Sequence, residues 1–200
     1  MRKKSTKAAN TLRMDEVVRV AARLFAAKGY HDTSVDEIAK EIGVSKPAIY
    51  YYFPSKGHIL RAIIDKMIEA SDNVINMGQS NLPPREKLEQ ILREMIQFST
   101  ERKEMSLIGF EQANILPQKS RYTLRRRQKA IRRVVEQTLR EGVEQGYFKI
   151  DNISMFTFAM LAAVNWCYRW YSPEGILKPE EIADQYILFI ERGILIPDSK

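Results

Sequence analysis

Apolar residues recur at helical spacing along nearly the whole chain. The first stripe has the spacing i, i+1, i+4, i+7, i+8 and consists of Val17, Val18, Ala21, Leu24 and Phe25. A glycine follows it at residue 29, where helices commonly end. No stretch alternates with period two, so the pattern predicts no strand. We therefore expect an all-α fold of about nine helices.

Two short helices are predicted directly after the first one. Thr33 or Ser34 is a favourable N-cap for a helix that ends at Gly43. Ser45 caps the next helix almost immediately, and Pro47 lies in its first turn, where a missing N–H breaks no hydrogen bond. Helices this close in sequence must turn sharply against each other, which is helix-turn-helix spacing.

The remaining helices are longer and belong to a second region. A fourth helix is capped at Ser55 and ends at the break formed by residues 78–84. The later helices are expected over residues 84–101, about 105–116, 118–145, 152 to about 171, and 179–193. The chain thus divides into a flexible basic arm over 1–12, a helix-turn-helix domain over 13–58 and a larger helical domain over 59–200.

The positive charge is concentrated near the N-terminus. The formal net charge is +7, and residues 1–60 hold 11 Lys/Arg against 6 Asp/Glu, a net of +5. Residues 61–200 hold the other 21 against 19, a net of +2. This asymmetry indicates an anionic partner for the N-terminal quarter, and it favours nucleic acid over a membrane.

Several features favour a cytoplasmic protein without a membrane anchor. The richest apolar run, over residues 155–164, is too short to cross a bilayer. The basic start lacks the apolar core of a secretory signal. Cys167 is the only cysteine and cannot form an internal disulfide, which fits a reducing compartment.

Four successive aromatic residues, Tyr50, Tyr51, Tyr52 and Phe53, belong to the third helix. Core packing explains Phe53 and Tyr52. Because successive helical residues are about 100° apart, the four rings cannot all face one core. At least one or two of them are expected at the surface, on the helix that enters the major groove in this motif.

Two lysines follow the N-cap serines of the third and fourth helices. Lys46 and Lys56 each place a cation at the positive end of a helix dipole, which is locally unfavourable. A phosphate would reverse the sign of this interaction, because free N–H groups, the dipole and the ammonium all attract it. The other interpretation is that both lysines simply point into solvent.

The segment TSVDEIAKEIGVSKPAIYYYFPSKGHIL, residues 33–60, resembles the DNA-binding segment of the TetR family. The matching positions are Thr33, Ile38, Ala39, Gly43, Val44, Ser45, Tyr50, Phe53, Lys56 and Leu60, with one extra residue before Ile38. The resemblance implies an all-helical homodimer with a three-helix DNA-binding domain and a ligand-binding C-terminal domain. It also implies a transcriptional repressor that leaves double-stranded operator DNA when an effector binds.

The resemblance also implies roles for residues around the third helix. By position, Thr33, Tyr50 and Lys56 would hold phosphates. The residues expected near base edges are Ser45, Lys46, Pro47 and Tyr51, and Ser34 and Ala48 complete the expected DNA-binding set. A lysine can bond guanine O6 and N7, and a tyrosine can contact a thymine methyl group or a phosphate.

The helix over 152–171 is apolar around nearly its whole circumference, so a second subunit is one way to cover it. The face expected to form a two-fold dimer through the last two helices consists of Phe156, Ala159, Met160, Ala163, Val164, Ile182, Tyr186, Phe189 and Ile190. Such a dimer would place two recognition helices about 34 Å apart along a duplex.

Flexible and aromatic residues of the middle helices are either the walls of a ligand pocket or plain core. These residues are Met95, Phe98, Met105 and Phe110. The segment 165–186, NWCYRWYSPEGILKPEEIADQY, resembles the C-terminal segment of TetR-family repressors of fatty-acid and sterol-ring breakdown, which respond to acyl-coenzyme A thioesters. The resemblance implies a small-molecule effector, possibly a long-chain acyl-CoA.

An acyl-CoA needs an apolar tunnel and cations for its phosphates. The candidate cations are Arg121, Arg125, Arg126, Arg127 and Arg169, although a solvated basic face or additional steering of DNA explains the arginines equally well. Trp166 and Trp170 either form the mouth of the ligand site or pack the corner between the last two helices.

An enzyme finds little support in the sequence. The usual motifs for phosphate loops, dinucleotide binding, hydrolases and metal sites do not occur, and we expect no cofactor and no metal. His31 and His58 stand alone. Two functions remain: a ligand-responsive dimeric repressor, or a helix-turn-helix protein whose C-terminal domain only dimerises or binds a protein partner.

Overall fold

Helices form the regular structure of the chain. The computed structural model describes residues 2–194, and the side chains of residues 14–194. Its elements are α1 (Arg2–Lys28), α2 (Val35–Ile42), α3 (Lys46–Tyr52), α4 (Lys56–Gly78), α5 (Pro84–Glu101), α6 (Lys103–Phe110), the 3-10 helix η1 (Ala113–Ile115), α7 (Gln118–Glu144), α8 (Ile153–Asn165), α9 (Cys167–Trp170) and α10 (Pro179–Ile194). The predicted all-α fold is confirmed. Among the described helices, none is both long and apolar enough to span a bilayer.

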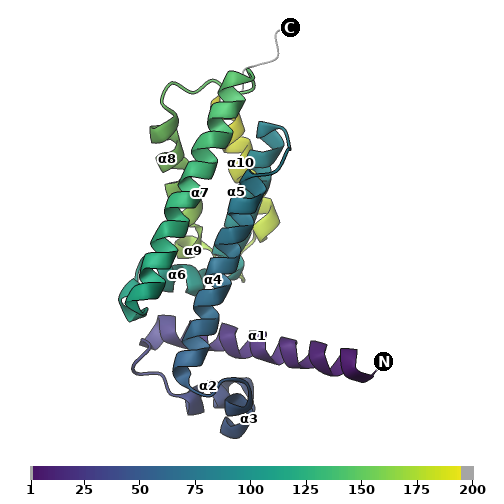
Figure 1. Cartoon of the computed structure of the whole chain (residues 1–200), viewed down its shortest axis with the longest axis vertical. Helices are drawn as coiled ribbons and strands as arrows, with labels where there is room; N and C mark the ends of the chain where they lie inside the picture. Colours follow the sequence, from purple (N-terminus) through teal and green to yellow (C-terminus); the bar gives the residue numbers. More distant parts are fainter. Residues whose placement is uncertain (1, 195–200) are drawn as a thin grey trace.

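The two long helices α4 and α7 pack side by side along the length of the molecule (Figure 1). A Cβ atom on Gly78 would lie 1.9 Å from Val134 Cγ1, so only glycine permits the close approach of the helices at this crossing. α1 packs across the lower part of α4, and α2 and α3 lie beyond it at the end away from the C-terminus. The expected helix-turn-helix therefore occupies one tip of the molecule.

The turn between α2 and α3 has the expected local chemistry. Ser34 is the N-cap of α2 and forms a capping box with Glu37. Gly43 ends α2 at φ 78°, in the left-handed region that glycine adopts without strain. The N–H of Val44 then donates to the carbonyl of Ala39 at 2.9 Å, which closes the end of the helix.

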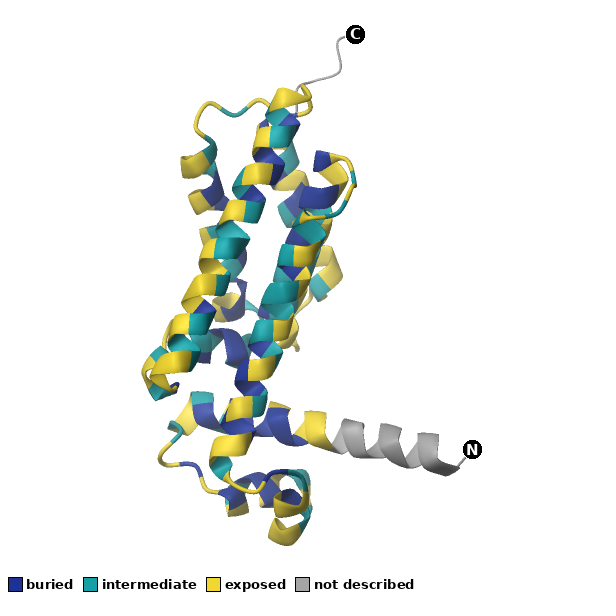
Figure 2. Ribbon diagram, in the orientation of Figure 1, coloured by how far each residue is buried: buried dark blue, intermediate teal, exposed yellow. Residues whose placement is uncertain are grey.

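One apolar core runs from the helix-turn-helix into the lower part of the larger domain. Phe25, Ile38 and Ile49 belong to the same buried cluster as Ile63 and Ile108. In Figure 2 the ribbons of α1 and α4 are coloured as buried near the point where the two helices cross. A second cluster joins the upper parts of α5, α7, α8 and α10. The division at residue 58 is thus not a break in packing, and it stays a prediction.

Three segments differ from the expected elements. α1 begins at Arg2 and so includes residues 2–12, expected as a separate arm, and no glycine or proline interrupts the sequence before Lys28; the flexibility of the arm stays a prediction. The helix expected over about 105–116 ends at Phe110 and is followed by η1. The helix expected to reach residue 171 breaks at Trp166, which separates α8 from α9. Residue 1 and residues 195–200, the outer ends of the arm and of the C-terminal domain, lie outside the described residues.

Candidate DNA-binding surface and effector cavity

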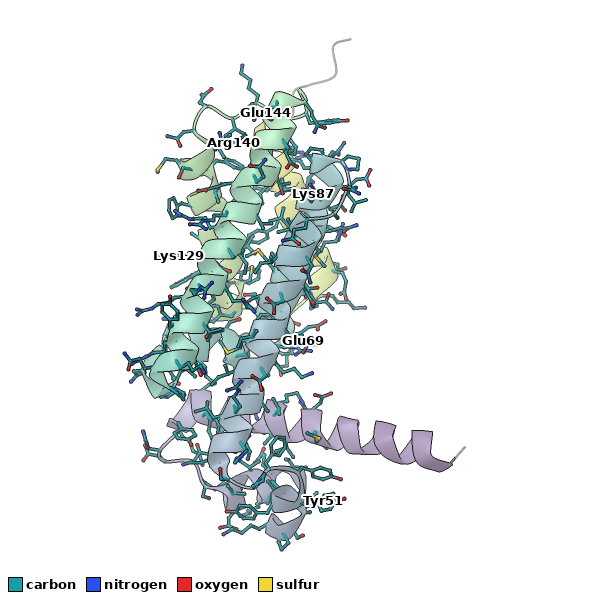
Figure 3. The ribbon with its side chains drawn as sticks, in the orientation of Figure 1. Tyr51, Glu69, Lys87, Lys129, Arg140 and Glu144 are labelled. Carbon is teal, nitrogen blue, oxygen red and sulfur yellow. The ribbon has the colours of Figure 1, made fainter. Side chains whose placement is uncertain are left out.

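α3 presents tyrosines to solvent because its opposite face is anchored in the core. Ile49 and Phe53 are only 1% and 4% exposed. Since successive residues are about 100° apart, Tyr50 and Tyr51 point elsewhere. Tyr51 is 78% exposed at the tip of the molecule (Figure 3), and Tyr50 is 42% exposed. Tyr52 is half-buried, and its ring meets that of Tyr51 edge to face at 5.0 Å.

The start of α3 lies at the same tip. Ser45, Lys46 and Pro47 are exposed, and Ala48 is half-buried. Ser45 is the N-cap by backbone geometry, but its side chain makes no capping hydrogen bond to the first N–H groups of the helix. We call the following residues the α3 surface: Ser45, Lys46, Pro47, Ala48, Tyr50 and Tyr51.

The ammonium of Lys46 already has an anionic neighbour. Its Nζ lies 2.6 Å from Oδ2 of Asp36, in the first turn of α2. This hydrogen bond raises the pKa of Lys46 above its ordinary value. Lys46 therefore does not simply point into solvent, because α2 supplies an ion-pair partner, and its contact with DNA stays a prediction. Both side chains remain partly exposed, so a phosphate or a base can compete with Asp36.

The other carboxylates of α2 are also paired. Lys28 donates to Glu37 at 2.8 Å, and Arg23 forms an ion pair with Glu41. The hydrogen bond from Lys28, with the backbone N–H of Ser34, lowers the pKa of Glu37 to about 2. These pairs mask the negative charge of α2 beside the α3 surface.

The neighbouring hydroxyls, Ser34 and Thr33, differ in their exposure. Ser34 is exposed, and its Oγ accepts the N–H of Glu37 at 3.1 Å. Thr33 is 1% exposed, and its hydroxyl donates to the carbonyl of Gly29 at 2.8 Å. The burial of this hydroxyl and its bond to the backbone argue against the expected phosphate contact of Thr33, which stays a prediction.

Lys56 ties the start of α4 to the loop between α1 and α2. Its Nζ donates to the carbonyls of Tyr30 at 2.7 Å, His31 at 3.2 Å and Thr33 at 2.8 Å. The ammonium also lies 4.5 Å from the centre of the Tyr30 ring. The protein itself supplies three acceptors for the three donors of Lys56, which argues against the expected phosphate contact; that contact stays a prediction.

A cavity of about 130 Å³ lies among α4, α5, α6, α7 and α8. Met95, Phe98 and Phe110 are among its lining residues, as expected for a ligand site. Sequence reasoning missed its polar lining, which consists of Ser71, Glu94, Ser99, Ser106, Gln128 and Asn165. Small polar residues on otherwise apolar helix faces are the signal that could have identified them.

Six predicted ligand residues are not among those that line this cavity. Met105 is buried beneath α1, in the core that the two regions share. Arg169 pairs with Glu111 at 2.8 Å and covers the ring of Trp166 at 5.2 Å, while Trp170 stacks on Tyr186 at 6.5 Å. For the two tryptophans, this arrangement favours packing of the corner over a cavity wall.

Arg121 and Arg125 lie on a strongly basic part of α7. Residues 118–133 include eight Lys or Arg and no acid. Within the part of the chain that the structure describes, no carboxylate lies within ion-pair distance of Arg125. Arg125 directly follows Leu124, which lines the cavity. Arg125 is thus next in sequence to a lining residue, but its own side chain is exposed and is not part of the cavity wall.

Three consecutive residues connect the cavity with the helix-turn-helix region. Phe110 lines the cavity, and its ring stacks on that of Tyr168 at 6.0 Å. Glu111 accepts a hydrogen bond from Tyr168 at 2.7 Å. Gln112 donates from Nε2 to the carbonyl of Ala26 in α1 at 3.0 Å. A shift at the cavity wall can thus reach α1 through one short segment.

The face expected to form the dimer is only partly available. Met160, Val164, Ile182 and Ile190 are buried within the chain itself, so that part of the expectation is corrected. Phe156, Ala163 and Tyr186 are half-buried. The exposed apolar residues of α8 and α10 form what we call the α8–α10 face: Met155, Phe158, Ala159, Ala162, Leu188 and Phe189.

The described residues offer little for metal or thiol chemistry. Among them, no group of three or more His, Cys, Asp and Glu side chains is placed to hold a metal ion. Cys167 is buried, and this burial raises the pKa of its thiol. A buried protonated thiol is a poor nucleophile.

Comparison with known proteins gives matches across most of the chain. Residues 17–63 match the family of bacterial regulatory proteins named tetR, and residues 81–194 match the tetracyclin repressor-like C-terminal domain. The chain is 26% identical over 188 residues to the HTH-type transcriptional repressor KstR2 of Mycobacterium tuberculosis, covering 91% of this chain and 92% of KstR2.

Two solved structures are similar to this chain over nearly their full length. A TetR/AcrR regulator from Thermobifida fusca is 31% identical, with a TM-score of 0.66 and coverage of 90% of this chain and 97% of that one. AibR, solved in complex with isovaleryl coenzyme A and operator DNA, is 28% identical, with a TM-score of 0.68 and coverage of 88% and 97%.

Proposed function

The chain belongs to the TetR family of bacterial regulatory proteins, and on that premise we propose that it is a ligand-responsive transcriptional repressor. It binds palindromic operator DNA as a homodimer and is released by a small effector, a fatty acyl-CoA. In this proposal residues 13–58 bind DNA, and the helices from residue 59 onward bind the effector and the second subunit.

The single observation that carries the DNA-binding role is the α3 surface. Tyr50 and Tyr51 are exposed on a helix whose other face is locked in the core. A major groove admits such a helix, with its N-terminal residues against base edges. Lys46 would exchange Asp36 for a guanine or a phosphate, and Tyr51 would contact a thymine methyl group or a phosphate. Tyr50 would contact a phosphate of the DNA backbone.

A two-fold dimer would cover the α8–α10 face. Phe158 on α8 and Phe189 on α10 expose large rings to solvent in the single chain. Large exposed apolar side chains gathered on neighbouring helices commonly mark a protein–protein interface. A symmetric pairing would also repeat the α3 surface, as an inverted-repeat operator requires.

The effector proposal combines the cavity with the cations on α7. AibR, a relative of this chain, was solved with isovaleryl coenzyme A, and KstR2 is named as a repressor. An acyl group would enter the cavity, and the phosphates of coenzyme A would lie outside it. Arg125 and its basic neighbours are on α7, the helix that also supplies Leu124, Gln128 and Ile131 to the cavity wall, and they would attract those phosphates.

Release of DNA would follow from movement of residues 110–112. A ligand that displaces Phe110 would pull on Gln112, which is bonded to α1. Because α1 shares its core with α2, α3 and α4, its movement would change the spacing of the two α3 surfaces in a dimer. The ligand needs only to bind better to the wrongly spaced state.

Selection from random duplexes tests the DNA-binding role. We expect enrichment of an inverted repeat whose half-sites lie about one helical turn apart, roughly 34 Å. Tyr51→Ala should then lower affinity for the selected duplex, as measured by fluorescence anisotropy, whereas Tyr122→Ala, an exposed tyrosine on α7, should not. Equal affinity of Tyr51→Ala and the unaltered protein would remove α3 from the interface.

Binding of operator DNA without release by any acyl-CoA would favour the alternative function, in which the C-terminal domain only dimerises or binds a protein partner.

A further inference from the structure

The cavity matches a small apolar group in size. Its volume is about 130 Å³. An engineered apolar cavity of roughly 150 Å³ in another protein takes up benzene, whereas drug-sized ligands occupy pockets of roughly 300–1,000 Å³. A palmitoyl chain or a fused ring system greatly exceeds this space. The volume therefore indicates an apolar group of about six carbon atoms.

The cavity wall contains an acid and no base. Glu94 lines it and accepts a hydrogen bond from Asn73 at 3.0 Å, across from α5 to α4. None of the lining residues is Lys, Arg or His. A carboxylate that entered this wall would lose its water without gaining a cation, which is strongly unfavourable. The group that enters is therefore uncharged, like an acyl thioester and unlike a free fatty acid.

Ser99 contributes a hydroxyl that has no partner. It lines the cavity, it is 3% exposed, and its Oγ makes no hydrogen bond within the described part of the chain. Neighbouring hydroxyls donate to the carbonyl four residues earlier, as Ser71 does to Met67 at 2.8 Å and Thr100 does to Ile96 at 2.8 Å. Ser99 thus has a donor to offer to a ligand, and an unmet buried hydroxyl is unfavourable until it is used.

From these features we propose that the cavity takes a neutral, short acyl group of about six carbon atoms, and that the Ser99 hydroxyl donates a hydrogen bond to its carbonyl oxygen. The inference rests on the proposed function, in which the effector is an acyl-CoA, and it restricts the acyl group to a short one. Ser99 then determines specificity, because it recognises the one polar atom of an otherwise apolar group.

Binding measurements with acyl-CoAs of different length test both parts of the inference. Isovaleryl-CoA, hexanoyl-CoA and palmitoyl-CoA, with isovalerate and coenzyme A as separate controls, are titrated into the full chain by calorimetry. We expect the two short thioesters to bind and the palmitoyl thioester and both controls to bind far more weakly. Ser99→Ala should weaken hexanoyl-CoA roughly threefold to tenfold, the effect of one neutral hydrogen bond.

Ser80→Ala is the matched control, because Ser80 has another buried hydroxyl without a partner but lies between α4 and α5, apart from the cavity lining. Ser80→Ala should leave the affinity for hexanoyl-CoA unchanged.

The midpoint of thermal unfolding without ligand should not fall in Ser99→Ala, since no hydrogen bond is lost. A fall would indicate a structural role and overturn the assignment. Tighter binding of palmitoyl-CoA would overturn the size limit and leave an acyl-CoA effector in place. If no thioester binds, the effector class fails as well, whereas the selection of DNA remains an independent result.

Discussion

At the scale of single residues, the cations of the DNA-binding region differ in what already holds them. Lys46 has one exposed carboxylate partner, Asp36, on the neighbouring helix. Lys56 has three backbone carbonyls and an aromatic ring. Exchange of one exposed carboxylate for a phosphate costs little, whereas removal of the ammonium from three carbonyls leaves their oxygens without a donor. The two lysines should therefore respond differently to mutation.

Asp36→Asn should strengthen binding to any duplex. The change removes the carboxylate that competes with DNA for Lys46, so one more phosphate contact becomes available. We expect a severalfold gain in affinity at low salt, and a log–log salt slope that steepens by up to about one. Fluorescence anisotropy over a salt series measures both. Glu41→Gln makes the same change in net charge but breaks a pair with Arg23. Equal gains in both variants would show a general charge effect, contrary to a specific role of Lys46.

Lys56→Ala should act on stability. Loss of the charged donor to three carbonyls should lower the free energy of unfolding by about 1–3 kcal/mol. The salt slope of DNA binding should stay the same, because no phosphate contact is lost. Denaturant unfolding and a salt series test the two statements. Lys40→Ala, an exposed lysine on α2, controls for the loss of charge. A slope reduced by about one with unchanged stability would restore the phosphate role of Lys56.

Glu37 should make stability depend on acid pH. Its pKa is lowered from 4.5 to about 2 in the folded chain, mainly by the hydrogen bond from Lys28. Between these values the unfolded chain binds more protons, so this contribution is full above pH 4.5 and is lost as pH falls towards 2. Glu37→Gln should therefore be less stable than the unaltered chain at neutral pH, and the difference should narrow on acidification. Thermal unfolding from pH 7 to pH 3 measures it; a difference independent of pH would contradict the assignment.

At the scale of elements, local chemistry was readable from the sequence and long-range packing was not. Ser34, Gly43 and Ser45 mark helix ends through their own backbone preferences, so the helix-turn-helix was predictable. α8 is apolar on all sides, and periodicity cannot tell which side faces the core. For that reason the sequence places Met160 in the dimer face, whereas the structure buries it within the chain.

The same limit applies to the site residues. Phe98 and Phe110 were recognisable as apolar candidates, and both line the cavity. The role of Lys56 depends on hydrogen-bond partners that are far away in sequence. The role of Ser99 depends on the absence of a hydrogen-bond partner for its hydroxyl within the described residues. Such relations arise only when helices pack. Sequence patterns therefore predict the helices that carry the site, but they predict the role of each side chain in the site less well.

The α8–α10 face gives the prediction that belongs to the element scale. Phe189 is 75% exposed in the single chain, so Phe189→Asp should fold normally while placing a charge inside the proposed interface. We expect the dimer to dissociate at least 30-fold more readily, as for an interface residue worth about 2 kcal/mol or more. Analytical ultracentrifugation measures this. Tyr122→Asp places the same charge at a 64% exposed ring on α7 and should leave the dimer intact. An unchanged dimer in Phe189→Asp would move the interface elsewhere.

At the scale of the whole molecule, the shared core makes the two regions mechanically continuous. Ile49 of α3 and Ile108 of α6 belong to one buried cluster. A rigid common core alone would transmit a movement at the cavity to all the helices that share the core, and not to one helix in particular. The hydrogen bond from Gln112 to Ala26 adds a specific link, because it joins the end of the cavity wall to α1 at one point. That link is where effector binding and DNA binding can be separated by mutation.

Gln112→Ala should uncouple the two binding events and leave each of them possible. The side chain is not among those that line the cavity, and its hydrogen bond goes to α1 rather than to the α3 surface, so affinity for operator alone and for hexanoyl-CoA alone should change little. Hexanoyl-CoA should weaken operator binding by a smaller factor in this variant, because the coupling free energy between the two binding events should fall by about 0.5–2 kcal/mol. Gln97→Ala, which removes a glutamine bond to Glu101 within α5, is the control and should retain full coupling. Because coupling is reciprocal, operator DNA must weaken hexanoyl-CoA binding by the same factor in each variant. Retention of full coupling in Gln112→Ala, measured from both directions, would show that the core carries the signal without this link.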